Sequence, residues 1–253
     1  MRPTFSGKVA VVTGGAGGIG YRIATDLHRS GVSVAILDKK PDPIAETNEG
    51  RRYYRGDITD ADFVADSVQR VTDALGPPRY LVNAAGVALL DRDGGIVGQD
   101  MEVLNRTLQV NLFGAILSTK ACLPHMLKDG GAMVHIASIT GLHNMENISE
   151  GGALDAYQMS KAALISLSRS LAIQYAPYKI RSNTVCPGAV QTPMTDEIYR
   201  DPERIEAMSS RTPLGRVGQP EDISFATLFL LADQASFITG IDLVADGGVL
   251  AKC

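Results

Sequence analysis

The stretch KVAVVTGGAGGIG at residues 8–20 decides the fold. Its first half is a short, β-branched apolar run that predicts a buried strand, and its second half places five glycines between residues 14 and 20. Glycine permits a tight turn, and without a Cβ it lets a pyrophosphate approach the amides at a helix N-terminus. A loop of this kind between a strand and a helix indicates a dinucleotide site, although glycines alone also fit a plain turn.

The pattern of that first unit repeats along the chain. Further strand-like runs lie at 32–38, 51–57, 79–86, 132–138, 180–188 and 241–248, and helical patterns lie between them at 18–31, 58–76, 104–127 and 156–176. Alternating strands and helices, with strands apolar on both faces, are typical of a parallel sheet covered on both sides. We therefore predict an α/β fold with a doubly wound, seven-stranded, Rossmann-like parallel sheet. No linker composition interrupts the pattern, so residues 1–253 are expected to form a single domain.

Composition and charge exclude several other classes. Hydrophobic residues make up 45% of the chain and charged residues 21%, which is ordinary for a globular protein. A net charge of −4, with no basic run longer than Lys39–Lys40, argues against a nucleic-acid partner. No apolar stretch approaches the roughly eighteen residues of a membrane span, and the N-terminus leads directly into the first strand. We expect no membrane association and a cytoplasmic location.

Cysteine and histidine spacing gives no reason to expect a metal. The three cysteines, Cys122, Cys186 and Cys253, are far apart and form no CxxC pair. The four histidines show no i, i+4 pairing. Neither a disulfide framework nor a metal site is predicted.

Asp38 ends the second strand-like run, eighteen residues after Gly20. This is the place of the acidic residue that accepts hydrogen bonds from the adenine ribose in dinucleotide-binding folds. A 2′-phosphate there would meet like charge, which costs about 4 kcal/mol at 4 Å and an effective dielectric of 20. NAD is therefore predicted to be preferred over NADP. Lys39 and Lys40 oppose this argument if either turns toward a 2′-phosphate, and otherwise they are solvated turn residues.

Several motifs occur together in one order: TGGAGGIG at 13–20, NAAG at 83–86, Asn111, Ser138, Tyr157-x-x-x-Lys161, and PGAVQT at 187–192. This set resembles the short-chain dehydrogenase/reductase family over essentially the whole chain, from Lys8 to Gly248. The resemblance implies a single-domain, NAD-dependent oxidoreductase with a catalytic tetrad of Asn111, Ser138, Tyr157 and Lys161.

The chemistry of the tetrad is consistent with that resemblance. Hydride transfer to a carbonyl leaves charge on oxygen, so an acid must deliver a proton, and Tyr157 is the candidate. Lys161 lies four residues later on the same helix face, and a positive charge about 4 Å away is predicted to lower the phenol pKa toward 7. By the resemblance, Lys161 also binds the nicotinamide ribose, Ser138 hydrogen-bonds the substrate oxygen, and Asn111 holds a water. A YxxxK pair alone more often marks an interface tyrosine near a surface lysine.

The resemblance also implies which residues contact the cofactor. It places Asp57 and Ile58 at the adenine, Asn83 behind the nicotinamide, and Val190 with Thr192 at the carboxamide. Asn83 has an alternative role, in which its side chain ties neighbouring strands together. The complete set of expected cofactor contacts is Gly14, Gly18, Ile19, Gly20, Asp38, Asp57, Ile58, Asn83, Ala84, Gly86, Tyr157, Lys161, Pro187, Gly188, Val190 and Thr192.

Two segments are expected to shape the substrate pocket. Residues 193–215 resemble a helical lid, with Met194, Ile198, Tyr199 and Met208 as its inward-facing side chains. Tyr157 follows Ser138 by nineteen positions, about six more than in most relatives, so residues 142–154 are predicted to form a rim loop. Glu146 and Glu150 in that rim would disfavour anionic substrates such as acyl thioesters. The alternative is a solvated insertion that does not contact substrate.

The favoured function is an NAD-dependent alcohol dehydrogenase or ketone reductase acting on a small neutral secondary alcohol or ketone. One alternative is a non-catalytic, NAD-binding redox sensor or scaffold, which has no need for an intact tetrad. A 3-oxoacyl thioester reductase is less favoured, and a nucleotide-sugar epimerase or dehydratase normally needs a larger carboxyl-terminal domain. By the resemblance, we expect a homotetramer, or alternatively a dimer, with close helix packing at the small residues Ala162, Ala163, Ser166 and Ser170.

Overall fold

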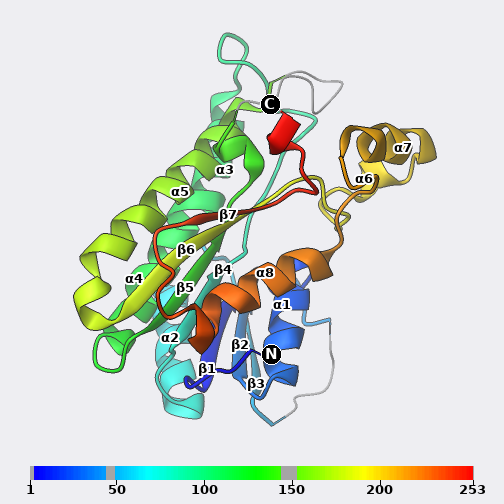
Figure 1. Ribbon diagram of the computed structural model, residues 1–253. Coiled ribbons are helices and arrows are strands. Elements are labelled where there is room, and N and C mark those ends of the chain that lie inside the picture. The colour runs from blue at the N-terminus through cyan, green and yellow to red at the C-terminus, as the bar shows by residue number, and fades with distance from the viewer. Residues whose placement is uncertain (1–2, 44–48, 144–152, 253) are drawn as a thin grey trace.

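The computed structural model of the protein describes residues 3–43, 49–143 and 153–252. In these residues seven parallel strands form one sheet in the order β3-β2-β1-β4-β5-β6-β7 (Figure 1). Each predicted run coincides with one strand, and only β5 begins one residue before its run: β1 (Val9–Thr13), β2 (Ser33–Asp38), β3 (Arg51–Arg55), β4 (Tyr80–Asn83), β5 (Gly131–Ile136), β6 (Ile180–Pro187) and β7 (Asp242–Ala245). The prediction of a doubly wound, seven-stranded parallel sheet is confirmed.

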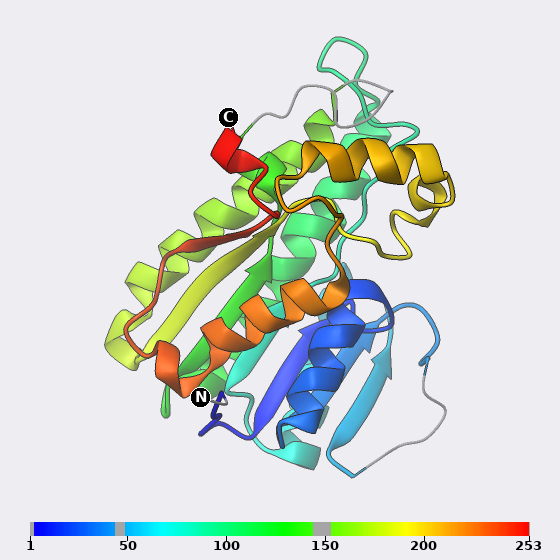
Figure 2. The same ribbon diagram turned by 45° about the vertical axis from the view of Figure 1, so that its right-hand side comes forward.

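Helices cover both faces of this sheet (Figures 1 and 2). On one face lie α1 (Gly18–Arg29) and α8 (Pro220–Leu231), and on the other lie α2 (Ala61–Leu75), α4 (Gly114–Met126) and α5 (Asp155–Gln174), with α3 (Met101–Leu108) beside α5. The short α6 (Asp196–Tyr199) and α7 (Pro202–Arg211) extend away from these two layers. Asp60 and Asp100 are the N-caps of α2 and α3, and their carboxylates accept hydrogen bonds from amides in the first turn of each helix.

The core consists of two layers because successive side chains of a strand point to opposite faces. In β1, Ala10 and Val12 pack toward α1 and α8, whereas Val9 and Val11 pack toward α2 and α4. All four are almost fully buried. This explains why the strands read as continuous apolar runs instead of alternating ones.

The segment predicted as one helix over 104–127 is divided in the structure. The α-helix α3 ends at Leu108, a π-helical turn spans Gln109–Phe113, and α4 continues from Gly114. A π turn inserts one residue into a helix and changes which side chains face a site. Gly114 follows it directly, and a Cβ at that position would lie 2.8 Å from Cγ2 of Ile58. The helix therefore passes close to the loop after β3.

The order of the strands locates a crevice. The chain moves outward from β1 to β3 and then returns to place β4 on the other side of β1. Loops at the carboxyl ends of β1 and β4 therefore diverge, and open parallel sheets bind their ligands at such a point.

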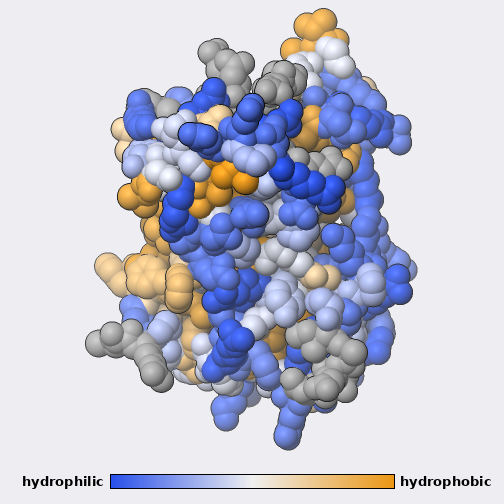
Figure 3. Space-filling model, turned by 90° about the vertical axis from the view of Figure 1, so that its right-hand side faces the viewer, coloured by the Kyte–Doolittle hydropathy of each residue, from blue (hydrophilic) through white to orange (hydrophobic). Residues whose placement is uncertain are grey.

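The surface in Figure 3 is mainly hydrophilic, with apolar side chains gathered in a few separate areas. Within the ranges described, no helix combines the length and the apolar character needed to cross a membrane.

Candidate active site

The four tetrad residues come from three separate elements and meet at one place. Asn111 lies in the π turn, Ser138 follows β5, and Tyr157 and Lys161 lie in the first two turns of α5. A Cβ built on Gly86 would lie 3.4 Å from Asn111 Oδ1 and 3.6 Å from Lys161 Nζ. The loop after β4 therefore passes between these two side chains.

Lys161 is placed against Tyr157 as the four-residue spacing predicted. Its Nζ lies 5.5 Å from the centre of the Tyr157 ring, over the ring face. Nζ also donates a hydrogen bond to the backbone oxygen of Ile136 at 2.8 Å. Lys161 is only 5% exposed, and burial lowers the pKa of its ammonium to about 8. The group is thus a buried cation whose charge is easier to remove than that of a surface lysine.

The predicted lowering of the Tyr157 pKa is not what the structure gives. Burial raises the pKa of Tyr157 to about 12, although a hydrogen bond with Ser138 acts in the opposite direction. The reason is that removing the phenolate from water destabilises it by more than the neighbouring groups stabilise it. Lys161 contacts the ring face and the Ile136 carbonyl, and no hydrogen bond between its Nζ and the Tyr157 hydroxyl is found in this site.

Ser138 is positioned by a short turn. It adopts an extended backbone and caps the 3₁₀ turn Ile139–Gly141, and its Oγ accepts hydrogen bonds from the Thr140 amide at 3.2 Å and the Thr140 hydroxyl at 2.9 Å. A Cβ on Gly141 would lie 2.8 Å from the backbone carbon of Lys161. The absence of a side chain at Gly141 therefore brings this turn, and Ser138 with it, directly against α5.

The side chain of Asn111 is held by hydrogen bonds on two sides. Its Oδ1 accepts a hydrogen bond from the Val87 amide at 2.7 Å, and its Nδ2 donates to the Val87 oxygen and to Ser160 Oγ, both at 3.0 Å. The amide group is thereby fixed between the loop after β4 and the helix that carries Tyr157. Its observed role is to join the loop after β4, the π turn and α5.

The glycine loop forms a close turn against the loop after β4. Gly14 has a φ of +71°, and a Cβ there would lie 2.6 Å from the Cα of Ala85. Gly18 has a φ of +53°, and Gly20 is so close that a Cβ would lie 2.3 Å from the Gly14 oxygen. Side chains are excluded at Gly14 and Gly20 by neighbouring backbone, so the loop presents backbone and not side chains at the start of α1.

The remaining glycine-loop and β4-loop residues border the same crevice. Ile19 and Ala84 are half-buried and pack against the core under α1. Asp38 lies beside the glycine loop, since its carboxylate accepts hydrogen bonds from the Ala16 amide at 3.0 Å and the Lys40 amide at 2.9 Å. The structure therefore brings together the strand-end acid and the glycines that the sequence paired by spacing.

The expected adenine contacts Asp57 and Ile58 lie at the end of β3. Burial would raise the pKa of Asp57, but hydrogen bonds from the amide and hydroxyl of Thr59 and the nearby Arg106 guanidinium outweigh it, so the pKa is lowered. Arg106 Nη2 lies 3.3 Å from Asp57 Oδ2. Sequence reasoning missed Arg106, because nothing in its local pattern indicates a partner 49 positions earlier.

The Asn83 side chain makes the contacts of the alternative role, in which it ties neighbouring strands together. Its side chain is 3% exposed, and its Oδ1 accepts a hydrogen bond from Ser118 Oγ at 2.7 Å. Its Nδ2 contacts Thr119 Oγ1 at 3.2 Å and His135 Nδ1 at 3.1 Å. The side chain therefore ties β4 to α4 and β5, and the expected cofactor contact of this residue stays a prediction.

The segment after β6 closes the crevice from the other side. Pro187 ends β6, and Gly188 fits against Asp246, where a Cβ would lie 2.8 Å from that residue's own Cβ. Val190 is buried and forms a bridge with Gly218. A Cβ on Gly18 would lie 3.3 Å from the Cβ of Thr192. Thr192 therefore packs directly against the glycine loop.

The expected lid and rim are described in part. Of the lid side chains expected to face inward, Tyr199 is buried, Met208 is half-buried and Met194 is exposed. Burial raises the pKa of Tyr199 to about 12. The side chain of Ile198 lies outside the described part of the chain. Most of the expected rim, including Glu146 and Glu150, also lies outside it, since residues 144–152 are not described.

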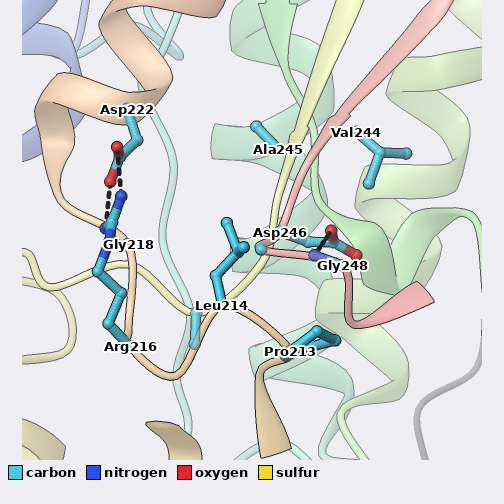
Figure 4. A pocket seen from close by; sticks show the side chains of 11 residues that line it. Pro213, Leu214, Arg216, Gly218, Asp222, Val244, Ala245, Asp246 and Gly248 are labelled. Atoms are coloured by element: carbon cyan, nitrogen blue, oxygen red, sulfur yellow. Dashed lines mark hydrogen bonds and ion pairs between the residues drawn. The ribbon is translucent and has the colours of Figure 1, made fainter. Parts of the chain in front are cut away.

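A cavity of about 450 Å³ lies beside the lid (Figure 4). It is bordered by Pro213 and Leu214, by the strand end Val244–Gly248, and by Arg216, which forms an ion pair with Asp222 at 2.7 Å. None of the tetrad residues lines it. The cavity therefore adjoins the base of the lid and is distinct from the crevice where the tetrad lies. Among the described residues, no group of three or more histidines, cysteines or acids is arranged to hold a metal.

Comparisons with known proteins find relatives over almost the whole chain. A family model described as "Enoyl-(Acyl carrier protein) reductase" matches residues 14–250. The cis-4-hydroxycyclohexanecarboxylate dehydrogenase of Sinomonas cyclohexanicum is 36% identical over 258 residues, covering 99% of this chain and 100% of the relative. The 2,5-dichloro-2,5-cyclohexadiene-1,4-diol dehydrogenase LinX of Sphingobium indicum is 32% identical over 256 residues and 98% of both chains.

Solved structures resemble the whole fold. The aldohexose dehydrogenase of Thermoplasma acidophilum superposes with a TM-score of 0.86 at 32% identity, covering 99% of this chain and 98% of the other. A protein from Brucella melitensis described as "Short-chain dehydrogenase/reductase SDR:Glucose/ribitol dehydrogenase" gives a TM-score of 0.88 at 29% identity, covering 98% of this chain and 99% of the other.

Proposed function

Because the chain belongs to the short-chain dehydrogenase/reductase family and is therefore an oxidoreductase, we propose that it transfers hydride between NAD and a secondary alcohol or ketone. One observation carries the proposal: a phenol, an ammonium, a serine hydroxyl and an asparagine from three elements converge beside the crevice between β1 and β4. A sensor or scaffold that only binds NAD has no use for this convergence.

The residues around the crevice fit a nicotinamide dinucleotide. The turn at Gly14 and Gly18 leaves no room for side chains and presents backbone amides at the N-terminus of α1, which suits a pyrophosphate. The Asp38 carboxylate accepts two amide hydrogen bonds and has further acceptor positions for ribose hydroxyls. Its negative charge favours NAD over NADP, because a 2′-phosphate would be repelled.

In the proposed mechanism the bound nicotinamide supplies or accepts the hydride. Tyr157 donates a proton to the substrate oxygen during ketone reduction and removes it during alcohol oxidation. Ser138, whose hydroxyl is close enough to lower the pKa of Tyr157 against the effect of burial, holds the substrate oxygen and stabilises the charge that develops on it. Lys161 provides a positive charge next to the phenol and binds the nicotinamide ribose.

The protonation states of the pair favour the acid role at neutral pH. With a Tyr157 pKa of about 12 and a Lys161 pKa of about 8, the pair consists of a neutral phenol and an ammonium at pH 7. That is the state needed to protonate a carbonyl oxygen. Alcohol oxidation requires the phenolate, so its rate should rise with pH.

The proposed substrates are small, neutral alcohols, with cyclic ones first. Two relatives are named for activities on six-membered ring alcohols, a neutral cyclohexadiene diol and an anionic hydroxycyclohexanecarboxylate, so they support the ring alcohol and not the neutral charge. The family model is named for an acyl carrier protein thioester, which keeps a thioester reductase as the alternative. The rim at 142–154 stays our proposed source of selectivity between the two.

The test is a substrate panel combined with a tetrad variant. Cyclohexanol, cyclohexane-1,2-diol, 4-hydroxycyclohexanecarboxylate, the matching ketones and acetoacetyl-CoA are offered with NAD(H) and NADP(H), and reduced nicotinamide is followed by absorbance. Turnover of a neutral alcohol or ketone supports the proposal. NADH binding without turnover of any member would instead support the sensor.

Tyr157→Phe is expected to lower kcat on the best substrate by about a hundredfold or more, because it removes only the proton donor. NADH affinity, measured by nicotinamide fluorescence, should stay within about twofold, since the ring and its contact with Lys161 are kept. Lys161→Ala should reduce both kcat and NADH affinity. An active Tyr157→Phe enzyme contradicts the assigned role.

We also propose that the protein assembles as a homotetramer, with a dimer as the alternative. The exposed face of α5 carries Ala162, Ser166 and Ser170 one turn apart, which permits close packing against a second copy. Phe225 and Phe229 on α8 are exposed on a different side of the molecule. A tetramer with three two-fold axes needs two such separate surfaces.

A further inference from the structure

The helix that carries Tyr157 receives its N-terminal cap from a distant loop. Its N-cap residue, Leu154, provides no side-chain hydrogen bond. Instead, the Ala156 amide donates to Asp93 Oδ1 at 3.1 Å and the Tyr157 amide donates to Asp93 Oδ2 at 2.9 Å. The Asp155 amide donates to the Gly94 oxygen at 3.2 Å. The first turn of α5 is therefore held by a residue more than sixty positions earlier.

Asp93 is itself firmly placed. It is 9% exposed, its Oδ1 also accepts a hydrogen bond from the Gly94 amide at 2.9 Å, and its own amide donates to the Leu89 oxygen at 2.7 Å. A carboxylate that accepts three amide hydrogen bonds at a helix N-terminus is well matched to the positive end of the helix dipole. The carboxylate therefore bridges its own loop and α5.

The same loop also holds a second member of the tetrad. Residues 84–100 connect β4 to α3, and within them Val87 makes both backbone hydrogen bonds to the Asn111 side chain. Asp93 lies six positions later and binds the backbone of Tyr157. One connection thus fixes Asn111 at one point and Tyr157 at another.

We propose that Asp93 is a positioning residue for Tyr157, which rests on the proposed role of Tyr157 as the proton donor. Tyr157 is the third residue of α5, and the hydrogen bond from its own amide fixes where its side chain starts. Lys161 lies one turn later, where the intrahelical hydrogen bonds no longer depend on the cap. Loss of Asp93 should therefore disturb the Tyr157 hydroxyl more than the cofactor-binding side of Lys161.

A cap that only stabilises the helix predicts a different result. Asp60 offers a matched control, because it caps α2 through two amides, those of Asp62 at 3.0 Å and Phe63 at 3.1 Å. Removing it takes away a two-amide cap, in this case an exposed one, from a helix that carries no tetrad residue. Both substitutions should lower the melting temperature, but only the loss of Asp93 should slow the reaction.

The experiment compares Asp93→Ala, Asp93→Asn, Asp60→Ala and Tyr157→Phe on the best alcohol of the panel. For Asp93→Ala we expect kcat to fall about tenfold to a hundredfold, the range for small misplacements of catalytic groups, with NADH affinity within about twofold. Asp93→Asn keeps the shape but places an amide donor against an N–H, so its kcat should lie in between. Asp60→Ala should keep the wild-type kcat.

Amide hydrogen exchange of the peptide covering residues 153–162, in the protein without substrate, provides a readout that does not depend on activity. Exchange should be faster in Asp93→Ala and unchanged in Asp60→Ala.

Several results would overturn the proposal. They are a wild-type kcat in folded Asp93→Ala, an equal loss of kcat and NADH affinity, or an equal fall of kcat in Asp60→Ala. If Asp93→Ala does not fold, a wild-type kcat and exchange rate in Asp93→Asn overturn it. An active Tyr157→Phe enzyme refutes the proposed function instead.

Discussion

Asp38 carries a single charge on which the proposed choice of cofactor depends. Its carboxylate is held by the amides of Ala16 and Lys40, so it stays at the carboxyl end of β2 beside the glycine loop. Lys39 and Lys40 are exposed next to it. The fixed acid should therefore have more influence than either lysine, because a solvated side chain gains little from an ionic contact.

Asp38→Asn should raise the ratio of kcat/KM for NADP to that for NAD about tenfold, since even a third of the repulsion at 4 Å corresponds to that factor. The ratio is measured from initial rates with both cofactors. Asp62→Asn, which removes the same charge from an exposed position on α2, should leave the ratio unchanged. An unaltered ratio in Asp38→Asn would show that residues other than Asp38 determine the preference for NAD.

The pKa of Tyr157 depends on burial more than on the charge of Lys161 beside it. The spacing of four correctly placed Lys161 beside the ring. The pKa of the phenol is nevertheless raised, because burial acts on Tyr157 and also lowers the pKa of Lys161. The two groups share a desolvated site, which is a property of the surrounding fold and not of their spacing.

Among the elements, α8 depends on a side chain from the sheet. Arg181 of β6 donates from Nη1 to the oxygens of Leu230 and Ile238, at 2.6 and 3.2 Å. Its Nη2 donates to those of Leu231 and Ala232, at 3.2 and 3.1 Å. The guanidinium thus satisfies three carbonyls at the end of α8 that no intrahelical partner reaches, and joins them to the Ile238 carbonyl in the connection to β7. Burial lowers its pKa, but an arginine remains charged.

Arg181→Met should destabilise the protein by about 2 to 3 kcal/mol, because it leaves partly buried carbonyls without donors. Arg181→Lys should recover part of this loss, since one ammonium cannot reach all four oxygens. Urea denaturation gives the free energy of unfolding. Arg29→Met, at an exposed arginine of α1, should stay close to the wild type, and an equal loss there would contradict the proposed cap.

The π turn between α3 and α4 is a second feature at the level of the elements. A continuous α-helix over 104–127 fits the apolar pattern, yet the chain adopts a π turn at Gln109–Phe113. The turn contains Asn111, whose side chain contacts Val87 and Ser160. Such turns occur often at functional sites, because they aim a side chain away from the regular helical direction.

For the whole molecule, a buried polar chain runs through the centre of the sheet. Asn83 of β4 contacts His135 Nδ1, and His135 Nε2 lies 3.3 Å from Ser182 Oγ of β6. Ser182 Oγ in turn lies 2.9 Å from Ser168 Oγ on α5. A neutral imidazole protonated on Nε2 satisfies both of its contacts. Burial lowers the pKa of His135 to about 4, so the ring stays neutral at physiological pH.

This neutral histidine should make global stability depend on pH. Between pH 6.5 and 4, His135 is protonated in the unfolded chain but stays neutral in the folded protein, because burial lowers its pKa. The free energy of unfolding therefore falls as the pH decreases from 6.5 toward 4. The contribution over this window is about 3 kcal/mol. The free energy of unfolding, measured with urea at several pH values, should depend less steeply on pH in His135→Gln than in the wild type. His143→Gln, at an exposed histidine, should keep the pH dependence of the wild type. Equal slopes for all three proteins would exclude His135 as the cause.

The sequence by itself determined the features that depend on short-range patterns. The seven strand runs and the covering helices follow from apolar periodicity, since burial on both faces of a strand is encoded residue by residue. The glycine turn follows from the glycines at positions 14 and 18, which can adopt the positive φ that the turn requires. The contact between Lys161 and the Tyr157 ring follows from the helical repeat.

Only the tertiary structure decided the features that arise from contacts between distant segments. Asn83 turned inward to Ser118 and His135, Asp93 reached across to α5, and the burial of Tyr157 raised its pKa. Each of these depends on which groups the fold brings within hydrogen-bond distance and on how much water it excludes. Neither quantity is a property of a local stretch of sequence, because both are set by the packing of separate strands and loops at one edge of the sheet.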